Sequence, residues 1–226
     1  MPHDDVTLII QGPVSHNGKL GKGILNIPTY KKFVGKIIIS TWILPELKPS
    51  KRFLINNDVT YLEDSPSKYE SFFNWHNVNY QTVTSLNGVN KTKTEYVIKS
   101  RSDEYYTDLS SFIEKMKFYG ECLITSEPFY REARTPRSIS DHLMGGKTSK
   151  IKSMFTAVYE KCKNNEVQLI SPTYAPEDLY RDNFDGANIT IKMNQLGQFW
   201  SKVGNNRITR KQYDENFSDG RRRVRR

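Results

Sequence analysis

Cysteine is scarce in this 226-residue chain. Its two cysteines, Cys122 and Cys162, are too far apart for a C-x-x-C motif. This pattern argues against a disulfide scaffold or a cysteine-based zinc cluster, and it favours a protein that stays in a reducing compartment.

Long apolar runs are also missing, since no stretch of 18 apolar residues occurs anywhere in the sequence. A membrane-spanning helix is therefore not expected. The first residues, MPHDDVTLIIQ, carry acidic side chains where a secretory signal would be basic. We therefore expect a cytoplasmic protein.

The common catalytic motifs do not occur: there is no G-x-x-x-x-G-K-[ST], G-x-G-x-x-G, G-x-S-x-G or H-E-x-x-H. The four histidines show no ligand spacing. The segment GKLGKG, Gly18–Gly23, is rich in glycine. It is either a mobile surface loop or a flap whose Lys19 and Lys22 contact a phosphate.

Positive charge is concentrated at the end of the chain. The net charge is +9, and residues 207–226 contribute +5 of it, with eight Lys or Arg against three acidic residues. A nucleic-acid-binding protein usually carries this charge on a folded face, so nucleic acid is not the favoured partner. The tail is either solvated and disordered or an electrostatic anchor to an anionic membrane surface.

Strand and helix patterns alternate along the first two thirds of the chain. Strands are predicted at 6–11, 36–42, 52–55, 95–102, 122–125 and 139–144, and helices near 24–34, 78–88, 109–119, 149–163 and from 176. Three consecutive isoleucines at 37–39 are typical of a central parallel strand. The order predicts one α/β domain, residues 1–206, with a mostly parallel, Rossmann-like sheet flanked by helices, followed by the basic tail, 207–226.

Two adjacent carboxylates, Asp103 and Glu104, follow the strand predicted at 95–102. Open α/β sheets bind ligands at the carboxyl ends of their strands, and a hard divalent cation takes carboxylate oxygens together with substrate phosphates. Alternation places Asp103 on the side of Lys99 and Arg101, and Glu104 on the other. The residues therefore indicate either a cation site or an ordinary Arg–Asp ion pair at a strand end.

Several segments in order resemble the WavE lipopolysaccharide-synthesis family, a group of GT-A-like glycosyltransferases. They are VTLIIQGPV from Val6, KIIISTW from Lys36, NVNYQTVTSLNGVNKTKTEYVIKSRSD from Asn77 and ISDHLMGGKTSKIKSMF from Ile139. The resemblance covers most of residues 5–180. It implies a GT-A-like fold and a transferase that uses a nucleotide-sugar donor and a glycan acceptor.

The resemblance also implies roles for particular residues. Asp103 matches the second acid of a D-x-D-like element that holds Mn²⁺ or Mg²⁺ on the diphosphate, and Arg101 stands in the place of the first acid. The residues implied to line the nucleotide pocket are Gln11, Gly12, Pro13, Asn79 and Gln81. Tyr80 departs from the family pattern, which often has arginine there.

If the transfer inverts configuration, a base must accept the proton of the acceptor hydroxyl. Asp141, before Gly145–Gly146, and Glu177, at a predicted helix start, are the candidates. Each also has a structural interpretation, as a turn or cap for Asp141 and as an acid near a helix dipole for Glu177. His142 either faces the acceptor or cation or is a structural histidine.

The leading hypothesis is thus a metal-dependent glycosyltransferase acting on lipopolysaccharide, capsule or another surface glycan, with peripheral contact at the cytoplasmic face of the membrane. One alternative is a nucleic-acid-binding module that uses the arginine-rich tail. The other is a nucleotidyltransferase on a similar sheet, which would release pyrophosphate.

Overall fold

The computed structural model describes residues 1–16, 18–43, 47–74, 76–126, 139–167, 176–191, 198–201 and 207–209. Its centre is a seven-stranded sheet in the order β10-β8-β9-β6-β1-β4-β5. The strands are β1 (His3–Gln11), β4 (Val34–Trp42), β5 (Val59–Asp64), β6 (Tyr96–Arg101), β8 (Leu123–Ser126), β9 (Leu143–Lys147) and β10 (Asn188–Ile191). Only β9 runs antiparallel to its neighbours in this sheet. The prediction of a mostly parallel α/β sheet is confirmed.

The middle strands are buried on both faces. Ile9 of β1 pairs in register with Ile38 of β4, and both side chains point to one face, while Ile10 and Ile39 point to the other. Branched apolar side chains fit this doubly covered position, because they pack on the pleated surface with little loss of rotamer freedom. The triple isoleucine is therefore a central strand, as predicted.

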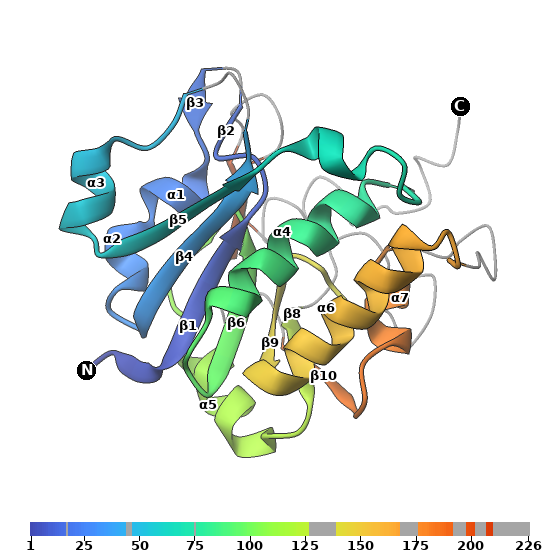
Figure 1. Ribbon diagram of the computed structural model, residues 1–226. Helices are drawn as coiled ribbons and strands as arrows, with labels where there is room; N and C mark the ends of the chain where they lie inside the picture. Colours follow the sequence, from blue (N-terminus) through green and yellow to red (C-terminus); the bar gives the residue numbers. More distant parts are fainter. Residues whose placement is uncertain are drawn as a thin grey trace, which may run out of the picture.

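Helices cover the two faces as separate layers (Figure 1). One face carries α4 (Val78–Lys91), α6 (Thr148–Lys163) and α7 (Pro176–Asp182), whose apolar side chains form one core cluster. The other carries α1 (Lys22–Leu25), α2 (Ile27–Tyr30) and α5 (Ser110–Tyr119), which pack into the second cluster. Helix α4 lies very close to the sheet, since a Cβ on Gly88 would come within 2.6 Å of the Ile9 side chain.

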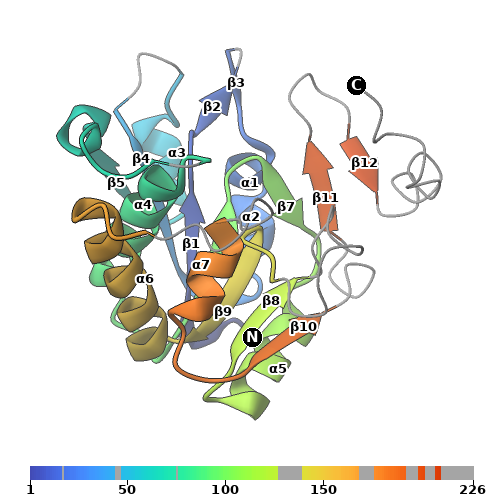
Figure 2. The ribbon, with the colours of Figure 1, turned by 90° about the vertical axis from the view of Figure 1, so that its right-hand side faces the viewer.

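Smaller elements complete the described chain. A second sheet joins β7 (Glu104–Tyr106), β11 (Gln198–Ser201) and β12 (Arg207–Thr209), which lie together beside the main sheet (Figure 2). A short hairpin, β2 (Ser15–His16) and β3 (Lys19–Leu20), follows β1, and the 3₁₀ helix η1 (Pro66–Tyr69) precedes α4. Strand β12 includes the first residues of the predicted basic tail, while residues 210–226 lie outside the described residues.

Two predicted strands are wrong in detail. Residues 52–55 are helical, in α3 (Lys51–Asn56), because the Ser50 side chain accepts a hydrogen bond from the Phe53 amide and caps a helix there. The third parallel strand is instead β5. The strand predicted at 139–144 begins later, as β9, so Gly145 and Gly146 lie inside it rather than after it. Within the described ranges, no helix has the length and apolarity to span a membrane.

Candidate active site

The polar residues of interest lie at the carboxyl edge of the central sheet. Strands β4, β1 and β6 are neighbours, and Gln11 pairs in register with both Ser40 and Arg101. The turn after β1 is fastened to this edge: the Gly12 amide donates to the Ser40 carbonyl at 3.3 Å, and the Ser102 hydroxyl donates to the Pro13 carbonyl at 2.6 Å. Gly12 has a φ of +110°, which favours glycine. The structure thus places Gln11, Gly12 and Pro13 beside Arg101.

The second half of the glycine-rich segment, residues 21–23, follows the β2–β3 hairpin and packs against the same edge. The Gly23 amide donates to the Ser102 carbonyl at 2.9 Å. A Cβ on Gly21 would approach the Ser102 carbonyl oxygen to 2.3 Å, and one on Gly23 would approach the Glu104 carbonyl oxygen to 2.5 Å. This half of the segment is therefore packed against the turn that carries Asp103, while Lys19 is exposed to solvent.

Arg101 and Asp103 form a bidentate ion pair. The Arg101 Nε donates to Asp103 Oδ1 at 2.9 Å and an Nη donates to Oδ2 at 2.7 Å. Burial acts to raise the pKa of Asp103, but hydrogen bonds and attraction from Arg101 outweigh it and lower that pKa. Both side chains keep contact with solvent, at 31% exposure for Arg101 and 41% for Asp103. The ion-pair alternative is therefore realised at a place that a ligand can reach.

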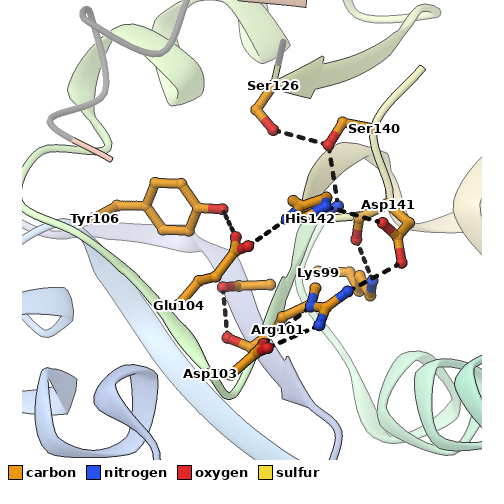
Figure 3. Close-up of polar contacts among 10 residues, drawn as sticks. Lys99, Arg101, Asp103, Glu104, Tyr106, Ser126, Ser140, Asp141 and His142 are labelled. Atoms are coloured by element: carbon orange, nitrogen blue, oxygen red, sulfur yellow. Dashed lines mark hydrogen bonds and ion pairs between the residues drawn. The ribbon is translucent and has the colours of Figure 1, made fainter. Parts of the chain in front are cut away.

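Glu104 points away from Asp103 into the protein (Figure 3). Its carboxylate is fully buried, accepts a hydrogen bond from the Tyr106 hydroxyl at 2.8 Å, and pairs with His142 Nδ1. The structure does not bring Asp103 and Glu104 around one point, because their side chains leave the chain on opposite sides. In the part of the chain that the structure describes, no group of three or more His, Cys, Asp or Glu could hold a metal ion. The donor set does not fit the predicted two-carboxylate cation site.

Asp141 lies two residues before β9, in contact with basic side chains from β6. Lys99 is almost fully buried, and its Nζ donates to the Asp141 carbonyl oxygen. The Asp141 carboxylate is 3.9 Å from an Arg101 Nη and 3.6 Å from His142 Nε2. Burial alone would raise the pKa of Asp141, but the nearby charges of Lys99, His142 and Arg101 lower it to about 2. Asp141 is thus a stable anion at neutral pH.

His142 lies between two carboxylates, those of Glu104 and Asp141. Burial acts to lower the pKa of His142, but these two acids outweigh it and raise the pKa. Basic and acidic side chains thus contact one another in a cluster of Lys99, Arg101, Asp103, Glu104, Asp141 and His142 (Figure 3). The sequence signals this cluster only by placing a lysine and an arginine in a buried strand that begins with apolar residues. The partner of Lys99 lies 42 positions further along the chain.

Glu177 lies at the start of α7, on the face of the sheet that α4 and α6 also cover. The hydroxyl of Tyr180, one turn further on, hydrogen bonds with the Thr82 hydroxyl at 3.1 Å. Burial raises the pKa of Tyr180, and the charges of Asp141 and Glu177 raise it further. The two acids predicted as bases therefore both lie near Tyr180.

The residues predicted on α4 have different surroundings. Asn79 is buried, and its side-chain amide donates to the Tyr69 carbonyl at 3.1 Å, so it fastens η1 to the helix. Gln81 is half-buried. Tyr80 packs edge-on against Trp42, with ring centroids 5.2 Å apart. The side chain that replaces the family's arginine thus adds an aromatic surface beside the end of β4.

Solved structures of known enzymes share the fold of this chain. Similar solved structures are the galactosyltransferase LgtC in complex with donor and acceptor sugar analogs (10% identity, 82% of this chain and 72% of that chain, TM-score 0.50) and the glycosyltransferase GlyE of Streptococcus pneumoniae (11%, 83% and 45%, 0.51). A third is 2-C-methyl-D-erythritol 4-phosphate cytidylyltransferase of Thermus thermophilus (9%, 96% and 98%, 0.50). At such identities the likeness concerns the fold, and it confirms the predicted GT-A-like fold.

No curated protein matches the sequence. The family model described as WavE lipopolysaccharide synthesis, however, matches residues 6–141, from β1 to the charged cluster, which is more than half of the chain. The chain therefore belongs to the WavE lipopolysaccharide synthesis family.

Proposed function

We propose that this protein is a glycosyltransferase that moves a sugar from a nucleotide-sugar donor to a lipopolysaccharide, capsule or other surface glycan. The observation that carries the proposal is the position of the partly exposed Arg101–Asp103 pair at the carboxyl edge, beside the Gln11–Pro13 turn. Ligands of open α/β sheets bind at this edge. The family membership gives the biosynthetic setting.

The donor nucleotide is proposed to lie across the ends of β4, β1 and β6. The Gln11–Pro13 turn would shape the base or ribose pocket, with the Trp42–Tyr80 aromatic pair and Gln81 along its α4 side. Arg101 would meet the diphosphate, because a guanidinium matches phosphate oxygens in pairs. Asn79 supports this pocket from behind, since its amide is already bonded to Tyr69.

Glu177 is the better candidate for the base that takes the acceptor proton. A general base works best when its pKa lies near the working pH. Asp141, with its pKa at about 2, is a poor proton acceptor, and its surroundings suit it to holding Lys99 and Arg101 in place. Glu177 lies half-buried at the start of α7, and its charge, like that of Asp141, acts on Tyr180.

The acceptor side of the proposal involves the membrane, where surface glycans are built on lipid carriers. The arginine-rich end, Gly220–Arg226, would hold the enzyme at an anionic surface. Each basic residue near such a surface contributes about 1 kcal/mol, and salt weakens the attraction. This part of the proposal depends on the sequence alone, because these residues lie outside the described ranges.

The test is a donor panel of UDP-, GDP-, CMP- and dTDP-sugars, offered with and without an oligosaccharide acceptor, with nucleotide products separated by chromatography. We expect one class of donor to transfer its sugar, so that the nucleotide part of that donor appears as the released product. No turnover of any donor would contradict the proposal. Formation of pyrophosphate from a nucleoside triphosphate and a sugar phosphate would identify a nucleotidyltransferase instead.

A further inference from the structure

We infer that Arg101, aimed by Asp103, supplies the positive charge for the donor's diphosphate, so that donor binding and transfer need no divalent cation. The inference rests on the proposed function and makes it more specific. It reverses the expectation that Asp103 and Glu104 hold Mn²⁺ or Mg²⁺. Asp103 becomes a positioning residue, and Arg101 becomes the residue that touches the substrate.

The carboxylates near the edge already have fixed partners. Both oxygens of Asp103 accept hydrogen bonds from Arg101. Glu104 is buried with Tyr106 and His142. The Asp141 carboxylate faces His142 and Arg101, at 3.6 and 3.9 Å. A divalent cation at this edge would have to displace a bound guanidinium, or lie beside it and be repelled.

The cluster contains as many basic side chains as acidic ones. The basic side chains are Lys99, Arg101 and His142, and the acidic ones are Asp103, Glu104 and Asp141. Removing one partner of a buried ion pair lowers stability strongly, because the remaining charge is left without compensation. The acids of the cluster are therefore better compensated by the basic side chains of β6 than by an added metal ion.

The geometry leaves part of the Arg101 guanidinium available. Nε and one Nη donate to Asp103, while the other Nη lies 3.9 Å from the Asp141 carboxylate, beyond hydrogen-bond distance. The side chain is 31% exposed at the edge where the donor is proposed to lie. A guanidinium held rigidly on one side can offer its remaining N–H groups to phosphate oxygens with little loss of conformational freedom.

The direct test measures binding of inorganic pyrophosphate and of UDP by calorimetry in EDTA. Wild-type protein is expected to bind in EDTA, and Arg101→Met is expected to weaken binding at least tenfold. Arg101→Lys, which keeps the charge but loses the fork, should lie between them. Arg52→Met removes one positive charge from exposed α3 and should leave the affinity unchanged. Thermal unfolding shows that each variant is folded.

Binding that appears only when Mn²⁺ or Mg²⁺ replaces EDTA, or that is equal in Arg101→Met and wild type, would overturn the inference. Paramagnetic resonance of Mn²⁺ gives a second readout. We expect wild type and Asp103→Asn to bind the same amount of Mn²⁺, because Asp103 is not a metal ligand. The donor panel separates the two proposals. Turnover that strictly requires a metal would contradict the inference but support the transferase proposal. Pyrophosphate binding in EDTA without turnover of any donor would contradict the transferase proposal but support the anion site.

Discussion

Lys99 is a basic residue buried in the interior of the protein. Its side chain is almost fully buried, and its ammonium group faces the carbonyl of Asp141. Burial lowers the pKa of Lys99, while the Asp141 charge opposes that change. A buried lysine is stable only when acids compensate it, so the lysine and Asp141 depend on each other.

At neutral pH, Asp141→Asn should therefore destabilise the protein by about 2 kcal/mol. The folded-state pKa of Asp141, about 2, lies below its ordinary value of 3.8, so its contribution is fully present above pH 4 and lost as pH falls toward 2. The difference in unfolding free energy between variant and wild type, measured by urea titration from pH 7 downward, should narrow below pH 4. A difference independent of pH would contradict this assignment.

Glu177→Gln should lower kcat by about a hundredfold or more, because the loss of a general base costs 10²–10⁴. The KM for the donor should change little, since the residue is proposed to act on the acceptor. Glu114→Gln, on the exposed side of α5, is the matched control and should behave as wild type. An unchanged kcat for Glu177→Gln would show that the base lies elsewhere or that configuration is retained.

Among the elements, the segment that leads from β3 into α1 packs against the turn between β6 and β7. Gly21 and Gly23 lie so close to the backbone of Ser102 and Glu104 that no side chain fits between them. The turn that carries Asp103 is thereby fixed by contacts with Gly21 and Gly23 as well as with the turn after β1. Packing of one backbone on another resists adjustment, because neither side is flexible.

Gly23→Ala should cost about 1–3 kcal/mol of stability, in the range of overpacking, although alanine normally favours a helix start over glycine. It should also weaken pyrophosphate binding by shifting the turn that carries Asp103. Gly18→Ala is the control: its Cβ would meet no atom within 4 Å, and its φ of +71° costs about 1 kcal/mol away from the site. Equal pyrophosphate affinity in both variants would show that the contact does not position the turn.

The elements that periodicity predicts best are those with a long apolar pattern. Strand β4, predicted at 36–42, and helix α6, predicted at 149–163, were both found to within two residues, since many residues share one period. Residues 52–55 were wrong because four residues fit a strand and a helix turn equally well, and the cap from Ser50 decided between them. The antiparallel direction of β9 depends on long-range pairing that no local pattern carries.

The site was predictable in part. Alternation along the chain correctly put Arg101 and Asp103 together and Glu104 on the opposite side, but it could not say that Glu104 pairs with His142. That contact joins residues 38 positions apart, one in β7 and the other directly before β9. The consequence for chemistry is large, because it removes one of the two carboxylates expected at the cation site.

On the scale of the whole molecule, one edge of the sheet carries the candidate chemistry and the chain ends in a cluster of arginines. Deleting Gly220–Arg226 should abolish binding to vesicles with anionic lipid in co-sedimentation, and leave thermal stability unchanged. Binding of the full chain should fall as salt rises. Salt-insensitive binding, or binding that survives the deletion, would remove the tail from the account.

The most direct measurement is a crystal structure of the protein with the nucleoside diphosphate that the donor panel selects. We expect the diphosphate at the carboxyl ends of β1 and β6, with its oxygens against Arg101 and the nucleoside beside the Gln11–Pro13 turn. A nucleotide bound elsewhere, with the Arg101–Asp103 pair untouched, would contradict the assignment of this edge as the active site.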